Sequence, residues 1–175
     1  MKAYHFVKDT LRDGTPIPKD GEWLEVPPPL EMCKRGLHAS LHPMDACQYA
    51  PGPILCLVEC EGEILHQIDK ICCSRRKIIA RFDATDLLRA DARASALSVI
   101  DKWKEPVPDV VLRYLQTGDE AIRSAAWSAA QSAAESAWAA RSAAWSAAES
   151  AARARLLSSI KARFESLGVT YDTQT

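Results

Sequence analysis

The sequence predicts an α+β fold: a small strand-rich N-terminal domain with one inserted helix, followed by an α-helical C-terminal part with one long Ala-rich helix. Short apolar runs such as ILCLVECE at residues 54–61 fill the first half between Gly and Pro positions, which is typical of strands. Residues 124–155 consist mostly of Ala and Ser without Gly or Pro, which favours a helix in almost any context. The expected divisions are 1–83 for a mixed, β-rich head, 84–117 for connecting helices, 118–168 for the long helix and 169–175 for a frayed tail.

Within the head, strands are expected to alternate with turns. Pro43 lies near the first position of a short helix, and the Pro-Gly-Pro sequence at residues 51–53 stops that helix. Gly62 allows a turn between two further strands. The Arg-Arg-Lys run at residues 75–77 indicates a solvated turn or edge rather than a binding patch. The expected strands are 2–7, 22–26, 54–61, 63–68 and 70–82, with two short extended pieces around Gly36 between residues 30 and 40.

The C-terminal half is expected to be helical. A helix capped by Asp83 or Thr85 should run to about Trp103, because Pro106 and Pro108 follow and cannot continue it. The remaining expected elements are a short helix at 110–115, a stop and cap at 117–119, and the long helix at 119–167, with Gly168 just beyond its end.

A repeat gives the long helix two different faces. The Ser-Ala-Ala-Trp unit at Ser124 recurs at Ser142, an interval of eighteen residues, which is about five turns of helix. The three tryptophans therefore share one stripe, and the opposite face carries only small side chains that let another backbone approach closely. We expect that face to pack against another copy of the same helix, or against the helix before it; the alternative is a solvated single helix. The expected interface residues are Ala125, Ala129, Ser132, Ala133, Ser136, Ala140, Ala143 and Ala147, with Trp127, Trp138 and Trp145.

Composition excludes several classes of function. The 175 residues carry a net charge of −1, so charge gives no argument for binding nucleic acid or an anionic membrane. Charged residues interrupt the Ala-rich helix every few positions, which argues against a membrane span. The polar start MKAYHFVKDT does not read as a secretory signal, so the six cysteines are expected to be free thiols in a cytoplasm.

One group of soft ligands falls within a short stretch. Cys33, His38, His42 and Cys47 could together hold zinc, but they contain no C-x-x-C pair and fall on different expected elements. We therefore expect no metal, and no resident cofactor.

A motif in the head leads to a first resemblance. Residues 33–49 read CKRGLHASLHPMDACQY, with an apolar strand at 55–62 after them. This pattern resembles an uncharacterised family of phage and prophage proteins that has a C-x-x-G-[LF]-H-A motif and Ala-rich C-terminal repeats. The resemblance implies a mobile-element origin, and hence the cytoplasm of a host cell, but no established activity.

The order of features in the head also resembles the PARP-type ADP-ribosyltransferase fold. The matching residues are His5, the Gly-Leu-His-Ala-Ser strand at 36–40, a helix ending in Tyr49, and a strand closing at Gly62. In that family the first-strand His holds the ribose of NAD and a Tyr stacks on nicotinamide, but no later Glu here matches the family's catalytic Glu. The resemblance implies His5 and His38 as catalytic candidates, NAD as cofactor, and a ligand site formed by His5, His38, Ser40 and Tyr49. The same residues also have an ordinary structural interpretation, in which His38 and Ser40 anchor the Gly36 turn by hydrogen bonds.

The first expectation for function is a non-enzymatic binding protein of phage type that forms a homo-oligomer through its Ala-rich helix. Its head would bind a host protein or a nucleotide-like small molecule, and it would inhibit a host defence system. The alternatives are an NAD-using relative of ADP-ribosyltransferases, either active or degenerate, and a structural component of a virion.

Overall fold

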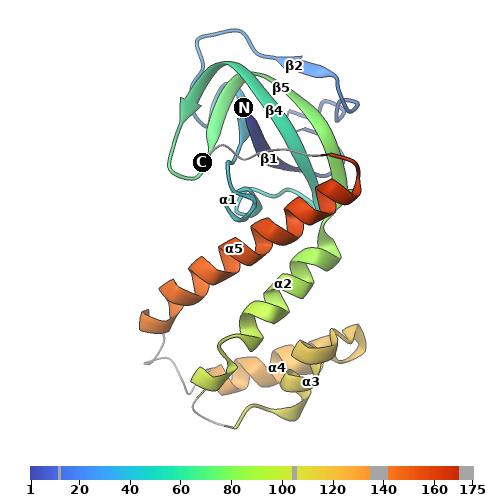
Figure 1. Cartoon of the computed structure of the whole chain (residues 1–175), viewed down its shortest axis with the longest axis vertical. Coiled ribbons are helices and arrows are strands. Elements are labelled where there is room, and N and C mark those ends of the chain that lie inside the picture. The colour runs from blue at the N-terminus through green and yellow to red at the C-terminus, as the bar shows by residue number, and fades with distance from the viewer. Residues whose placement is uncertain (12, 104–105, 135–141, 170–175) are drawn as a thin grey trace. The chain divides into compact units, whose positions relative to one another are not determined.

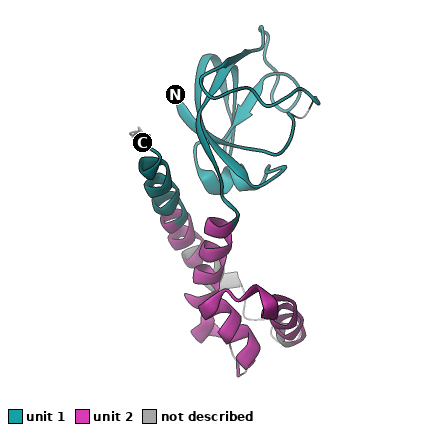
Figure 2. Cartoon of the chain, turned by 90° about the vertical axis from the view of Figure 1, so that its right-hand side faces the viewer, with its two compact units in different colours: residues 1–85, 156–175 teal, residues 86–155 magenta. Residues whose placement is uncertain are grey.

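The computed structural model describes residues 1–11, 13–103, 106–134 and 142–169, and within these it leaves out the side chains of 133–134 and 142–147. The α+β expectation is confirmed: an antiparallel sheet of five strands is followed by helices (Figure 1). The chain forms two compact units, which divide it at other places than the expected segments. One unit joins Met1–Thr85 to Leu156–Thr175, and the other is Asp86–Arg155 (Figure 2).

The sheet of the first unit is built around two long strands. β4 (Ile54–His66) and β5 (Ile71–Asp83) pair along most of their length, β1 (Lys2–Val7) pairs with β4, and β2 (Trp23–Glu25) pairs with β5. β3 (Leu37–Ala39) also pairs with β5, next to the start of that strand. The helix α1 (Pro43–Cys47) follows β3, and His42 caps it by accepting a hydrogen bond at Nδ1 from the Met44 N–H (3.1 Å).

Ser40 closes the sheet on itself. Its N–H donates to the carbonyl of Tyr4 (2.9 Å), and the Tyr4 N–H donates to the carbonyl of Ser40 (2.8 Å). Because Ser40 directly follows β3, these two bonds connect the β3 side of β5 to β1 at the far side of β4. The inward faces of β1, β4 and β5 therefore surround one interior instead of lying against a separate layer.

β4 differs from the sequence expectation of two strands with a turn at Gly62. It is one continuous strand whose pairing with β5 shifts register twice, between Leu57 and Val58 and again at a β-bulge where the pairing passes from Glu61 opposite Arg75 to Ile64 opposite Cys73. Gly62 has φ +77°, and the Glu63 N–H donates to Oγ of Ser74 (3.0 Å). A left-handed glycine provides the extra residue of such a bulge, so the strand bends without ending.

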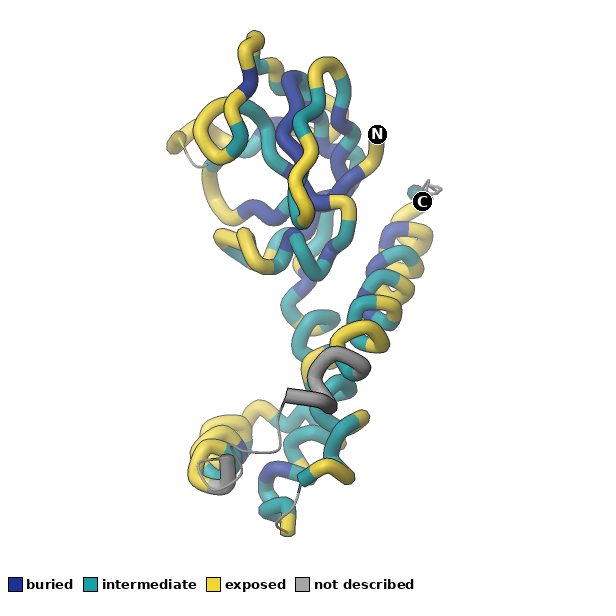
Figure 3. Tube along the Cα trace, turned by 90° about the vertical axis from the view of Figure 1, so that its left-hand side faces the viewer, coloured by how far each residue is buried: buried dark blue, intermediate teal, exposed yellow. Residues whose placement is uncertain are grey.

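The interior is filled mainly by small and β-branched side chains. Alternate residues of β1 and β4 point into it, as expected for the two-residue period of a strand, and Figure 3 shows the buried residues along the strands of the head. The buried cluster comprises Ala3, Val7, Ala39, Cys56, Val58, Cys60, Ile71, Cys73 and Ile78.

The second unit is helical, and its elements differ from the expected ones mainly at their ends. α2 (Thr85–Leu97) ends earlier than the expected Trp103 and is followed by a 3₁₀ turn at Ile100–Lys102. α3 is Asp109–Thr117, a 3₁₀ turn at Glu120–Ile122 leads into α4 (Arg123–Ala134), and α5 is Ser142–Ser166. The single unbroken helix expected over 119–167 is not tested, because residues 135–141 lie outside the described residues. No helix in the described ranges has both the length and the apolar character that crossing a membrane requires.

Small residues do let α4 pack on the helix before it. α4 contacts α3, Ala126 is buried, and Ala129 and Ala130 on the same face are partly buried. Gly118 makes the short connection possible: it ends α3 with φ +69° and donates its N–H to the Tyr114 carbonyl (2.8 Å). α4 therefore packs on α3 through a face centred on Ala126, which is not one of the residues expected for the small-residue interface, while Ala125 and Ser132 of that set are exposed.

The end of α5 belongs to the compact unit of the head. Leu156, Ile160 and Phe164 lie four residues apart, so they share one face of the helix, and all three are buried. The Phe164 ring contacts Phe82 of β5 edge to face, with centroids 5.2 Å apart and an interplanar angle of 73°.

We predict that Phe164→Ala lowers the free energy of unfolding by about 3–5 kcal/mol, because it removes a fully buried aromatic side chain and leaves a cavity beside Phe82. Urea denaturation would measure the change. Glu165→Ala, at the next and exposed position, is the matched control and should change stability by less than about 0.5 kcal/mol. Equal effects of the two substitutions would contradict the packing described here.

Candidate functional site

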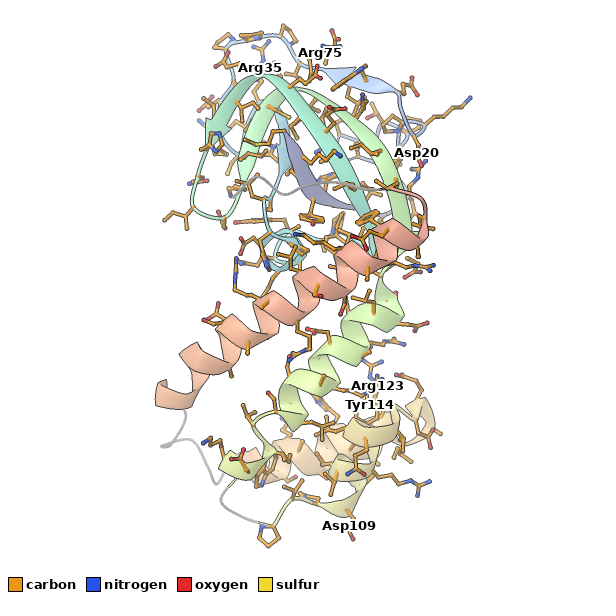
Figure 4. All side chains as sticks on the ribbon, in the orientation of Figure 1. Asp20, Arg35, Arg75, Asp109, Tyr114 and Arg123 are labelled. Carbon is orange, nitrogen blue, oxygen red and sulfur yellow. The ribbon has the colours of Figure 1, made fainter. Side chains whose placement is uncertain are left out.

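The basic run of β5 contains one residue unlike its neighbours. Arg75 lies on the outer surface near β2 (Figure 4), where it forms ion pairs with Glu25 (2.8 Å) and Glu61 (3.0 Å). Lys77 pairs with Glu59 (2.7 Å). The sequence interpretation of a solvated edge is therefore right for these two residues. It is wrong for Arg76 between them, of which only 4% is exposed.

Strand geometry turns Arg76 into the interior. From residue 75 onward, burial along β5 alternates, so that Arg76, Ile78 and Ala80 are buried and Arg75 and Lys77 are not. Ile78 belongs to the buried cluster, and Arg76 points to the same side. That alternation was not readable in the sequence RRKIIA, in which three basic residues are followed directly by two isoleucines.

The buried charge of the Arg76 guanidinium has few hydrogen-bond partners and no counter-ion among the described residues. Its Nη1 donates a hydrogen bond to the backbone carbonyl of His38, and within the described ranges this is its one hydrogen bond and it has no carboxylate partner. Burial lowers the pKa of Arg76 from its ordinary value. An arginine this deeply buried is normally paired with an acid or an anion.

His5 is the nearest ionisable ring on β1. It lies between Ala3 and Val7 on the inward face of the strand. Burial, and then the nearby charge of Arg76 and the proximity of His38, hold the pKa of His5 well below 6.5. The ring is therefore neutral near pH 7, with one nitrogen able to donate and the other to accept. No hydrogen bond joins it to another side chain of the described residues.

Cysteine thiols form the other neighbours of the guanidinium. Cys60 lies opposite Arg76 in the β4–β5 pairing. Burial raises the pKa of Cys56 to about 12, so its thiol stays protonated. Cys60, by its hydrogen bond, lowers the pKa of Cys73, but Sγ of Cys73 donates to the Leu37 carbonyl (3.3 Å), which requires the thiol proton. The thiols therefore give the charge polarisable neighbours but no counter-ion.

The unused donors of Arg76 are not sealed off from the surroundings. Among the described residues, Nε1 of Trp103 is the one buried side-chain nitrogen or oxygen without a hydrogen-bond partner. That description does not apply to the remaining guanidinium nitrogens of Arg76 or to the ring nitrogens of the partly exposed His5. Since these nitrogens have no hydrogen-bond partner among the described residues, they must be at least slightly accessible to solvent. Two polar groups without protein acceptors thus reach outward from the interior of the sheet.

His38 connects this interior to the surface of the head. Its carbonyl accepts from Arg76, and its ring Nε2 accepts the N–H of Cys33 (3.0 Å), a residue with φ +67°. The hydrogen bond holds the loop before Gly36, in agreement with the structural interpretation of His38. The His38 ring is therefore held by the Cys33 loop, and it is the backbone carbonyl of His38 that faces Arg76.

Tyr49 lies in a separate surface cluster. Its hydroxyl donates to Asp69 and accepts from Nζ of Lys70 (3.4 Å), and Nζ lies 4.5 Å from the centre of its ring. Hydrogen bonds, first with Cys33 and then with Tyr49, raise the pKa of Lys70. Of the four residues expected to bind a ligand, His5 and His38 are therefore brought together around Arg76. Tyr49 is connected to them only through Lys70 and Cys33, and Ser40 serves in the closure of the sheet.

The possible zinc ligands are used in other ways. His42 caps α1, His38 holds the Cys33 loop, and no group of three or more His, Cys, Asp or Glu residues in the described ranges is arranged to hold a metal ion.

We predict that His5 makes stability fall in acid. Its folded-state pKa lies below 6.5, so below that pH the unfolded chain takes up a proton that the folded chain does not, and stability is lost as pH decreases. Urea denaturation between about pH 8 and pH 5 should show a smaller loss for His5→Gln than for the wild type. His66→Gln, at an exposed position, should follow the wild type. Parallel curves for wild type and His5→Gln would show that the ring is not buried neutral.

Comparison with known proteins places the head in a family. A domain of unknown function, DUF7666, matches residues 1–90, which include all five strands and Arg76. No curated protein and no solved structure matches the chain. Since the matched segment covers half of the sequence, the chain belongs to the DUF7666 family.

Proposed function

We propose that this chain is a non-enzymatic interaction protein that associates with a second copy of itself through its Ala-rich region, while its head binds a ligand. The observation that carries the proposal is Trp127, of which 74% is exposed on α4. A large aromatic ring on the surface of a folded helix is typical of residues that a partner covers.

The surroundings of Trp127 fit a second helix. Arg123 and Gln131 lie one turn before and after the ring. Around the helix from it, the exposed residues Ser124, Ser128, Ser132 and Ala125 are small, so another backbone can approach on that side while the ring is covered at its edge. α4 already uses the Ala126 face on α3, which leaves the Trp127 face for a partner. The Ser-Ala-Ala-Trp sequence recurs at Ser142, and this repetition favours a partner of the same sequence.

The proposed target of the head is a host protein or a nucleotide-like small molecule. The resemblance of the motif at residues 33–39 to phage proteins favours a target in the host cell, and inhibition of a host defence protein is the role we propose for the assembled molecule. The head residues that support binding are His5 and Arg76, whose remaining donors have no acceptor among the described residues, while the His38 carbonyl holds the Arg76 guanidinium in place.

We predict that Trp127→Ser and Ala125→Leu each reduce the mass of the assembled protein in solution, measured by size exclusion with light scattering across a range of concentrations. The reason is that one removes the covered ring and the other enlarges the small-residue surface. Both positions are exposed within the single chain. At low protein concentration the free energy of unfolding of each variant should therefore lie within about 0.5 kcal/mol of the wild-type value.

Ala126→Leu is the matched control. Ala126 is buried, so the larger side chain should cost about 1–3 kcal/mol of stability through overpacking against α3. A wild-type chain that stays monomeric at every concentration would remove the association. The full chain is required, because a truncation after residue 117 would also delete Phe164 from beside Phe82.

A further inference from the structure

We propose that Arg76 and His5 form a binding site for the oxyanion group, phosphate or carboxylate, of a small molecule. This inference rests on the proposed function of the head as a ligand-binding module, and it names the chemistry of that ligand. Arg76, which has no carboxylate partner among the described residues, would be the principal contact of that ligand.

The first step is the balance of charge. Arg76 is 96% buried, with 4% exposed, and no carboxylate in the described part of the chain forms an ion pair with it. A buried, uncompensated cation is strongly destabilising, and proteins normally pair it or hydrogen-bond it fully. The Cys56 and Cys73 thiols beside it are protonated, as argued above, so they do not provide the missing negative charge. An anion bound from outside the chain would provide that negative charge.

The second step is the supply of hydrogen-bond donors. A guanidinium is a planar fork of N–H groups that matches the two oxygens of a carboxylate or phosphate. One Nη1 bond to the His38 carbonyl fixes the orientation of the plane, and the other edge has no acceptor among the described residues. The fork is therefore held in place by its own backbone contact, with one edge open.

The third step is the second group at the same place. His5 enters from β1 and Arg76 from β5. Arg76 reaches the carbonyl of His38, two residues before Ser40, which pairs with Tyr4 next to His5, and the charge of Arg76 contributes to the lowered pKa of His5. The neutral ring can donate one N–H to an oxyanion. Neither His5 nor Arg76 has an acceptor for its remaining donors among the described residues, and both keep an exposed part. Two convergent donors from different strands distinguish this site from an isolated buried arginine.

The surroundings limit the size of the group that fits. The residues paired with Arg76 and His5, Cys60 and Cys56, are fully buried, and only 4% of Arg76 is exposed. We therefore assign to the site one terminal phosphate or carboxylate, with the rest of the ligand outside. A nucleotide monophosphate and a short carboxylic acid present this same chemistry.

The test measures binding by isothermal titration, at constant ionic strength, with three probes: inorganic phosphate, adenosine monophosphate and acetate. Dilute protein below its association range separates this result from the proposed self-association. We expect at least one probe to bind the wild type. Binding of phosphate and the nucleotide, but not of acetate, identifies a phosphate ligand, and the reverse identifies a carboxylate. If none of the three binds, the site is overturned.

Arg76→Met and Arg75→Met form the matched pair, since they are adjacent on β5 and opposite in burial. Arg76→Met should weaken binding at least tenfold, while Arg75→Met should leave it unchanged. Without ligand, Arg76→Met should melt at the same or a higher temperature, because an apolar side chain of similar volume replaces an uncompensated charge. A melting temperature that falls clearly, with binding intact, would show that the guanidinium only pins the His38 carbonyl.

His5→Gln keeps the test decisive if Arg76→Met does not fold. Weaker binding in His5→Gln, with a melting temperature near that of the wild type at pH 7, would support the site. Unchanged affinity in a folded His5→Gln variant would overturn it as described, because the second donor would then be irrelevant.

Discussion

The pairing of β4 with β5 is the interaction on which the rest of the head depends. β1 attaches to the outer side of β4, β2 and β3 attach to β5, and a bulge at Gly62 lets β4 continue without ending. The hydrogen bonds between Tyr4 and Ser40 then join the two sides. Because the closed interior is narrow, Ala, Val and Cys fill most of it, and only a residue such as Arg76, with a long thin stem, can carry a charge into it.

That charge shapes the chemistry of its neighbours. Arg76 contributes to the low pKa of His5, and its contact with the His38 carbonyl connects the interior to the Cys33 loop. The loop in turn connects through Lys70 to Tyr49 on the surface. The residues that the sequence grouped together by motif are thus part of one polar path, but Arg76, which lies far from the motif in sequence, provides its centre.

The sequence predicted the elements well where local signals were strong. Periodicity located β1 and β5, and Pro43 marked the start of α1, since these signals act within a few residues. Gly62 was taken for a turn because a glycine with positive φ serves a turn and a bulge equally, and only the partner strand distinguishes them. Of the residues of the proposed site, His5 and His38 were candidates from the sequence and Arg76 was not, because inward direction depends on a register that a single strand does not reveal.

The assignment of Leu156–Thr175 to the same compact unit as the strands makes residues 86–155 an insertion within the head domain. The face of α5 that carries Leu156, Ile160 and Phe164 has a fixed rotational setting relative to Phe82. An insertion of eighteen residues ahead of Leu156, the interval between the two Ser-Ala-Ala-Trp units, would add about five complete turns of helix and so keep that face in phase with the residues before it. An insertion of two residues would turn the same face by about 200° relative to them.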